Sequence, residues 1–358
     1  MNKKKIKIIG AGISGLTAAI NLKKAGYIVE VYEKNKDVGL RFNGDMQGLE
    51  NWSEEKNILE ELNEIGIKIN FECTPFNKAI LSNTKEKTEA RLEKPFFYLI
   101  KRGQVKNSLD NGLKKQAIKE GVKIIFNKTI EEKEADIVAT GPMMKKIPYA
   151  DTGIVFKTKS KDRAILIFND KLGYKEYSYL LVHNKYGCMC SMVADDLKKV
   201  NDCFKNLKEY FTKNYSLDIQ NPKKVGGIGS FCFPSHFKQK YGKQKVIYVG
   251  EAAGLQDFFL GFGMRYAFQS GFLAAKSIIE NKNYKKMAKN KFNKKLKASI
   301  VSRYLFEKYS PLIYYSTPKF PRIYEKALPE MYKFNLIYWL TYPFAKRYFN
   351  KKYSKLKK

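Results

Sequence analysis

The chain has 358 residues and a formal net charge of +33, from 68 Lys and Arg against 35 Asp and Glu. This length can bury a large core, and two domains are expected. The chain has only two His, and its five Cys are scattered without zinc or disulfide spacing. We therefore predict no metal site and no His-based triad, and the Cys pattern fits a reducing cytoplasm. No apolar run of about 18 residues occurs, so no membrane-spanning helix is expected.

The first element is a short apolar run, Lys5 to Ile9, followed at once by a glycine motif. A helical pattern covers residues 13–25, and residues 27–32 are typical of a second strand. This strand–turn–helix–strand order is what a dinucleotide fingerprint needs. The residues assigned to the motif are Gly10, Gly12, Ile13, Ser14 and Gly15.

Each part of this unit has a physical role. Gly10 allows a tight turn, Gly12 lets the backbone approach a pyrophosphate, and Gly15 lets the helix pack close to the strand. The helix N-terminus offers free N–H groups to phosphates. Glu33, followed by Lys34, ends the second strand, 18 residues after Gly15. Its carboxylate would accept hydrogen bonds from the adenosine ribose and repel a 2′-phosphate, so a site for NADP is not expected.

The middle of the chain contains several further strand patterns. Residues 97–102, followed by a helical pattern to Gly121, and residues 136–142 are typical of two more strands. Residues 163–168, 177–182 and 188–193 predict strands and residues 198–210 a helix. These elements indicate an antiparallel sheet over the cofactor, to which residues 74–95 could add strands. Cys188 and Cys190 would share one face of a strand, as core thiols or, alternatively, as a redox pair.

A second glycine-rich segment lies far from the first. Residues 245–249 predict a strand that ends at Gly250, Glu251 and Ala252. Gly261, Gly263 and Met264 then precede a helix to Ile279, whose positive N-terminal end would face the flavin edge that becomes negative on reduction. The two segments together predict FAD, bound along its whole length by a discontinuous domain.

The motifs quoted above resemble the geranylgeranyl reductase family, within the flavoenzymes related to p-hydroxybenzoate hydroxylase. The likeness covers about residues 5–280, including Gly226-Gly227 and Pro234, which are similar to the segment that passes the flavin ring. It implies that Arg102 lies near FAD, and that Thr140 and Gly141 end the strand after the adenosine half.

The resemblance also assigns a loop after the Glu33 strand. Family members place an Arg and often a Cys beside the flavin here; Arg41 is present and a Cys is not. Arg41 is therefore a candidate for the pyrophosphate, with Asn43 or Asp45 near the ring. The alternative is a glycine-rich surface loop with a solvated Arg.

Besides the missing Cys, the chain departs from the family pattern in three places. Glu251 replaces the usual Asp, from where it can still reach a ribityl hydroxyl, and Phe258 replaces the usual Pro. The aromatic signature of the substrate sheet lacks its Trp and Pro. Tyr179 and His183 are the catalytic candidates in that region, for lining the pocket or supplying a proton, although such residues often serve only sheet packing.

The last 78 residues carry 21 Lys and Arg, three acids and 18 aromatic residues, a net charge of +18. Residues 334–344 are too short to span a bilayer, but aromatic rings with flanking Lys suit the headgroup layer of an anionic membrane. A second interpretation is a Lys-rich helical cap that packs on the body. A third, nucleic-acid binding, is not favoured, because no recognised motif accompanies the charge and Arg is scarce. Pro residues at 311, 318, 321, 329 and 343 are expected to break the helices.

We therefore expect an α/β protein with a discontinuous Rossmann-like FAD domain (residues 1–75, 96–150 and 240–282), a substrate sheet domain (76–95 and 151–239) and a helical basic region (283–358). The expected activity is reduction of C=C bonds in an isoprenoid lipid or prenyl diphosphate, with NADPH or a ferredoxin-like carrier as electron donor. FAD-dependent hydroxylation and a flavin protein that binds membranes without turnover are the alternatives. We expect a cytoplasmic location, peripheral on the inner face of the cell membrane if the tail binds lipid.

Overall fold

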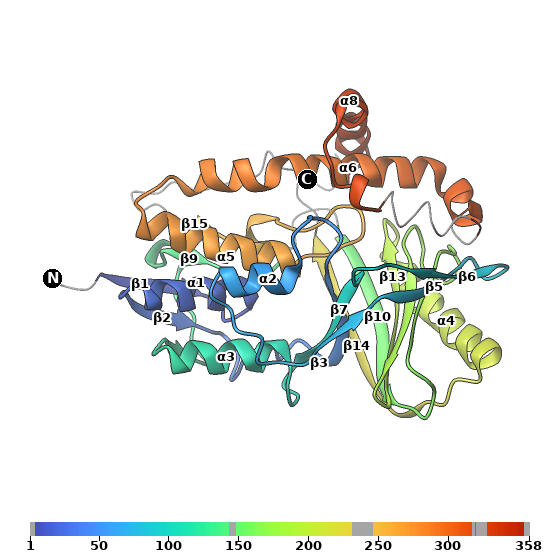
Figure 1. Cartoon of the computed structure of the whole chain (residues 1–358), viewed down its shortest axis with the longest axis horizontal. Helices are drawn as coiled ribbons and strands as arrows, with labels where there is room; N and C mark the ends of the chain where they lie inside the picture. The colour runs from blue at the N-terminus through green and yellow to red at the C-terminus, as the bar shows by residue number, and fades with distance from the viewer. Residues whose placement is uncertain (1–3, 143–147, 231–245, 317–318, 320–327, 354–358) are drawn as a thin grey trace.

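The computed structural model describes the chain apart from residues 1–3, 143–147, 231–245, 317–318, 320–327 and 354–358. Figure 1 shows a parallel sheet with its helices at one end, an antiparallel sheet at the other, and C-terminal helices along one side. This confirms the expected α/β class. Pro234, Cys232 and one of the two His residues, His236, lie outside the described residues.

The parallel sheet has five strands in the order β15-β9-β1-β2-β8, with the glycine-motif strand β1 in the centre. Its apolar strands are buried because helices α1, α3 and α5 pack together on one face, with α1 in contact with both others. The bounds are β1 (Lys5–Ile9), β2 (Ile28–Tyr32), β8 (Lys123–Ile125), β9 (Ile137–Val138), β15 (Ile247–Tyr248), α1 (Ile13–Lys24), α3 (Leu109–Lys119) and α5 (Met264–Ile279).

The second sheet has seven strands in the order β14-β10-β13-β12-β11-β5-β6, antiparallel except for the β11–β5 pair. Helix α4 covers one face, where Leu207 and Phe211 are fully buried among strand residues such as Met189 and Leu180. The strands alternate, so the opposite face carries Cys188 and Cys190, as predicted. The bounds are β5 (Lys78–Ser82), β6 (Lys87–Arg91), β10 (Pro148–Lys157), β11 (Arg163–Ile167), β12 (Ser178–His183), β13 (Tyr186–Ala194), β14 (Gln220–Ser230) and α4 (Val200–Tyr215).

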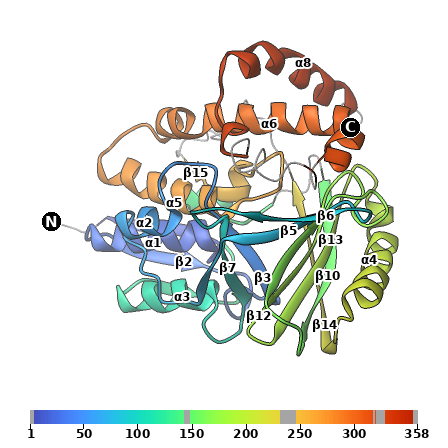
Figure 2. The ribbon, with the colours of Figure 1, turned by 45° about the vertical axis from the view of Figure 1, so that its right-hand side comes forward.

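A smaller sheet, β3-β7-β4, lies between the two larger ones (Figure 2). Its bounds are β3 (Asn43–Glu50), β7 (Phe97–Gly103) and β4 (Cys73–Phe76), and helix α2 (Ile58–Glu64) follows β3. Residues 74–95 were expected to extend the substrate sheet. Only β5 and β6 do so. Strand β4 instead pairs with β7 in the small sheet, with Pro75 opposite Tyr98 and Phe76 opposite Phe97.

The C-terminal region contains two long helices, α6 (Tyr284–Ser316) and α8 (Leu336–Lys352). Pro311 lies within α6 next to a kink at Tyr309, so this expected break is a bend. Pro343 lies inside α8, and the predicted break there is wrong. Its ring is on the exposed side, where water can solvate the carbonyl that loses its hydrogen bond. No helix in the described part of the chain has the length and apolar character needed to cross a membrane.

Candidate functional site

The candidate site begins at the carboxyl edge of the parallel sheet, where β1 turns into α1. Gly10 has φ +96°, and a Cβ there would stand 2.3 Å from the carbonyl oxygen of Ala139. A Cβ on Gly15 would stand 2.0 Å from the carbonyl of Gly10, so only glycine allows helix α1 to pack this close. By contrast, a Cβ on Gly12 would meet nothing within 4 Å. Open space therefore lies beside the backbone at the N-terminus of α1, as a bound pyrophosphate would require.

Glu33 lies where the sequence predicted a ribose-binding carboxylate. One oxygen accepts a hydrogen bond from the backbone N–H of Ala11 at 2.9 Å, which ties the carboxylate to the glycine turn. The other oxygen accepts from Asn35, through its backbone and side-chain amides at 3.0 and 2.7 Å. The side chain is mostly buried, while Lys34 is exposed. The carboxylate is thus held rigidly at the edge where an adenosine ribose would lie.

The second glycine segment packs directly on the first. A Cβ on Gly250 would stand 2.8 Å from Oγ of Ser14, and one on Gly271 of α5 would stand 2.3 Å from the Ser14 carbonyl oxygen. The Gly250 N–H donates to the hydroxyl of Ser270 at 2.9 Å. Two segments more than 200 residues apart in sequence therefore form one wall. The cofactor candidates near this wall include buried Ile13 and Ala252, exposed Thr140, and half-buried Gly263 and Met264 at the start of α5.

Arg41 lies at the junction of these segments. Its guanidinium is 3.7 Å from the carboxylate of Glu251, and it also lies 4.0 Å from the Cβ position of Gly141. It lies 3.7 Å from the Cβ position of Gly227, in the segment that resembles the flavin-passing one. The side chain is half exposed. Arg41 is therefore a partly exposed charged group where the Glu251, Gly141 and Gly227 segments meet, and it remains a candidate for the pyrophosphate.

Arg102 has a different environment from that of Arg41. Its guanidinium forms two hydrogen bonds of 3.0 Å to the carboxylate of Asp110, and Asp110 also accepts from the Gly103 N–H at 2.7 Å. The pair is buried, and burial alone would raise the pKa of Asp110. The charge and hydrogen bonds of Arg102 outweigh this effect, so the pKa of Asp110 is lowered. The ring of Phe42 lies between Arg102 and Arg41, at 4.2 and 4.8 Å from the two guanidinium carbons. Arg102 thus positions the Arg41 loop as well as lying near the site.

The carboxyl groups around Arg41 were only partly found from the sequence. Burial raises the pKa of Asp45 and of Glu251, and Arg41 opposes both shifts. Asp151 in β10 was missed. Burial, with a smaller contribution from the charge of Asp45, raises its pKa to about 6, while Arg41 and the Gly227 N–H favour its charged form. Asp151 is the one carboxyl group in strand β10 and lies on the strand face that is turned towards the site, which was the signal for it.

The two catalytic candidates lie at different places on strand β12. Tyr179 is directly opposite Cys190 and lies on the face that carries Asp151; burial raises its pKa well above 10, so its hydroxyl remains protonated. His183 lies at the far end of the strand. Its ring nitrogens are 2.7 Å from Asp162 and 3.2 Å from the hydroxyl of Thr74. The structure therefore brings Tyr179, but not His183, to the same wall as Asp151.

The loop between the second glycine segment and α5 is fixed from outside the parallel-sheet domain. Phe258, which stands where the family pattern has Pro, is 2% exposed and packs edge-on against Phe349 of α8 at 5.0 Å. Its N–H, which a Pro would lack, donates to Ser299 of α6 at 3.2 Å. The buried carboxylate of Asp257 accepts from the N–H groups of Phe259 and Leu260 and from the hydroxyl of Tyr332. This departure therefore couples the loop to the C-terminal helices.

An apolar cluster lies against the same loop. Phe262, between the two glycines of the motif, packs edge-on against Trp52 with the ring centroids 4.7 Å apart. The cluster joins this loop to the site face of the large sheet and to the small sheet. Its buried members include Met46, Phe97, Leu99, Leu181, Cys188 and Cys190.

The parallel sheet with its two glycine turns and the antiparallel sheet that covers them form an arrangement that known proteins share. The family model for an NAD(P)-binding Rossmann-like domain matches residues 8–47. Among solved structures, a geranylgeranyl bacteriochlorophyll reductase-like protein from Thermoplasma acidophilum has a TM-score of 0.68 at 18% identity, covering 99% of this chain and 100% of that one. The flavin-dependent brominase Bmp2 has a TM-score of 0.62 at 16% identity, covering 99% and 100%.

A 2-methyl-3-hydroxypyridine-5-carboxylic acid oxygenase is also similar, with a TM-score of 0.58 at 15% identity, over 86% of this chain and 92% of that one. One curated relative, 4,4'-diaponeurosporene oxygenase of Staphylococcus haemolyticus, is 46% identical over 43 residues, which are 12% of this chain and 9% of that protein. This short match lies well below half of either chain. The similarities to solved structures extend over nearly all of the chain and show that it has the fold of the FAD-dependent oxidoreductases related to p-hydroxybenzoate hydroxylase.

Proposed function

We propose that this protein is an FAD-dependent oxidoreductase that reduces C=C bonds in an isoprenoid lipid. The observation that carries the proposal is the apolar cluster that meets the second glycine segment at Phe262. An isoprenoid chain has only C–H surface to bury, so apolar side chains suit it; in this structure the cluster is closely packed, and its side chains would move apart to admit the chain. The similarity to a geranylgeranyl bacteriochlorophyll reductase-like protein over its whole length supports the same substrate class.

The residues present fit FAD. Open space at Gly12, the carboxylate of Glu33 on the glycine turn and the guanidinium of Arg41 would hold its adenosine and pyrophosphate parts. Glu251 and the segment from Gly261 to Met264 would hold the flavin end. Bound and reduced FAD would supply a hydride to one carbon of the double bond.

The protein must then supply a proton to the second carbon. Asp151 is suited to this role, because its pKa of about 6 leaves part of the population protonated near neutral pH. Tyr179, on the same face, can donate a hydrogen bond but does not ionise in the physiological range. We assign the proton-donor role to Asp151 and a pocket-lining role to Tyr179. The electrons would come from NADPH or a ferredoxin-like carrier.

The test is an anaerobic titration of the purified protein. The visible spectrum is recorded, the protein is reduced with dithionite, and vesicles that contain a geranylgeranylated phospholipid are added. We expect the oxidised flavin spectrum to return and a saturated lipid to be found by mass spectrometry. Asp151→Asn should slow reoxidation by about 10²-fold or more, as for loss of a general acid, while Tyr179→Phe should have a smaller effect.

Other outcomes would favour other functions. If the spectrum returns only when oxygen enters, a hydroxylase or halogenase becomes the better assignment, as the similar oxygenase and brominase folds allow. If no flavin is bound and none can be added back, the oxidoreductase proposal is wrong. A protein that binds FAD and vesicles but turns over under neither condition would be a binding protein without turnover.

A further inference from the structure

The outermost element of the C-terminal region is helix α8, which packs on α6 on the side away from the parallel sheet (Figure 2). Its first turns carry large apolar side chains that are exposed: Leu336 at 71%, Ile337 at 68%, Leu340 at 55% and Phe344 at 67%. Residues spaced by three, four and seven positions share one face of a helix. These four side chains therefore form a continuous apolar strip, which we call the outer face of α8.

The outer face cannot turn inward, because the opposite face of α8 is fixed. Ala345 and Phe349 are fully buried, and Phe349 packs against Phe258 in the loop of the candidate site. Tyr338 approaches the hydroxyl of Ser302 in α6 at 3.1 Å. Lys352 forms ion pairs with Glu307 and Asp195 at 2.5 and 2.6 Å. The helix is thus a rigid support that presents its outer face to solvent.

Basic residues continue the same face. Arg347 lies seven positions after Leu340, and Lys351 lies seven after Phe344, so one helix face is apolar in its first half and basic in its second. Lys346, beside Arg347, is also exposed. No acidic residue occurs within α8 itself.

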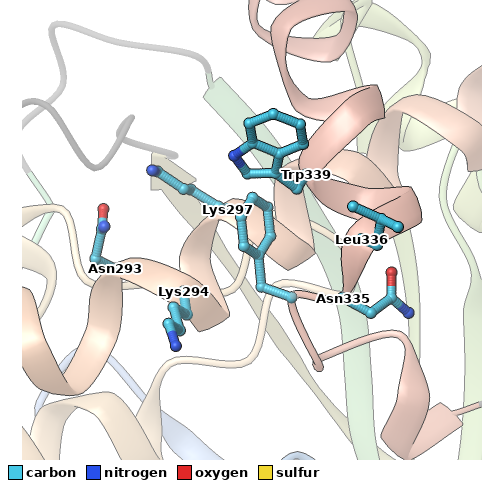
Figure 3. Close-up of a pocket in the computed structure, with 7 residues that line it drawn as sticks. Asn293, Lys294, Lys297, Asn335, Leu336 and Trp339 are labelled. Carbon is cyan, nitrogen blue, oxygen red and sulfur yellow. The ribbon is translucent and has the colours of Figure 1, made fainter.

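A groove of about 470 Å³ between α6 and α8 extends this surface. Figure 3 shows Lys294 and Lys297 on the α6 side of this groove, with Leu336 and Trp339 on the α8 side. Trp339 is 61% exposed. The Lys297 ammonium lies 5.6 Å from the centre of the Phe334 ring. Exposed aromatic rings beside Lys ammonium groups are typical of surfaces that sit at the level of lipid headgroups.

We propose that the outer face of α8 and the adjoining groove dock on an anionic membrane surface. Apolar side chains would enter the boundary between headgroups and acyl chains, while Arg347, Lys346 and the groove lysines face the lipid phosphates. A nucleic acid would leave the apolar strip in water, and a second copy would bring two strongly basic tails together. The proposal does not depend on which reaction the flavin site performs.

The experiment measures binding of the full chain to vesicles of phosphatidylcholine, with and without 30% phosphatidylglycerol. Each basic residue near the surface contributes about fivefold in affinity, so Lys346→Gln with Arg347→Gln should weaken binding to anionic vesicles about 30-fold. The matched control is Lys205→Gln with Lys208→Gln, which removes the same charge from exposed positions of α4 and should change binding by less than about twofold.

The apolar contribution has its own matched pair. Leu340→Ser should weaken binding about fivefold, since the side chain has to leave water to dock. Ile118→Ser in α3, at an equally exposed position (54% against 55%), should not. The emission of Trp339 should shift to shorter wavelength on binding, whereas Trp52 is already buried. FAD content of every variant, read from absorbance, shows that it has folded.

Several results would overturn the proposal. They are equal binding to neutral and anionic vesicles, no binding to either, or equal losses in the variants of α8 and their controls. Tight binding to a DNA duplex that anionic vesicles do not displace would point to nucleic acid instead. A dimer in sedimentation that Leu340→Ser dissociates, with vesicle binding unchanged, would assign the outer face to a second copy.

Discussion

Phe349 of α8 provides the sharpest test of whether the C-terminal helices support the flavin site. Its side chain is fully buried and packs edge-on against Phe258 at 5.0 Å, in the loop that leads to Gly261 and Gly263. Replacement by Ala removes a buried aromatic ring, which typically costs about 3–5 kcal/mol in the free energy of unfolding. An aromatic pair is worth about 0.5–1.5 kcal/mol beyond burial, so FAD affinity should fall about two- to tenfold if the loop depends on this pair.

The assay combines urea denaturation with FAD titration of the apoprotein. The control is Phe211→Ala, another fully buried Phe, which packs between α4 and the sheet face away from the site. Both variants should lose stability, but only Phe349→Ala should weaken FAD binding. Unchanged FAD affinity in Phe349→Ala, at a urea concentration where it is fully folded, would refute the coupling. Because α8 covers Phe258, truncation of the tail cannot separate membrane binding from flavin binding, and point variants on the outer face are needed.

Three further predictions follow from the site and its supports. Gly15→Ala places a Cβ 2.0 Å from the Gly10 carbonyl oxygen, so the purified variant should lack flavin absorbance near 450 nm. Asp151 has a pKa raised from 3.8 to about 6; its protonated form is favoured in the fold, so the associated stability is present below pH 4 and lost as pH rises through 6. At pH 7.5 the free energy of unfolding of Asp151→Asn should therefore exceed that of the wild-type apoprotein by an amount on the order of 3 kcal/mol, measured by urea denaturation. This difference should shrink towards pH 5. Arg303→Met leaves the carboxyl of Glu176, which is fully buried, without its guanidinium partner, and should cost about 3–5 kcal/mol at pH 8, measured by urea denaturation; a loss below 1 kcal/mol would contradict that value.

The sequence determined the cofactor half of this protein because that half depends on local constraints. The turn at Gly10, the open backbone at Gly12 and the carboxylate of Glu33 follow from residue types at fixed spacing between a strand and a helix. The strand alternation of Cys188 and Cys190 also needs only a period of two. Such features are set by neighbours in the chain, and each could be stated before the fold was known.

The tertiary structure decided the features that depend on distant segments. The sequence did not reveal that Asp151 lies within electrostatic reach of Arg41 and Asp45, since burial and the charges of distant segments set its pKa. Nor did it show why Phe258 replaces Pro, which became clear only from its contacts with Ser299 and Phe349. The basic tail was interpreted either as a membrane-binding surface or as a helical cap on the body, and the two are compatible. One face of α8 packs on the body while the other remains exposed. Only packing between helices decides which residues lie on which side.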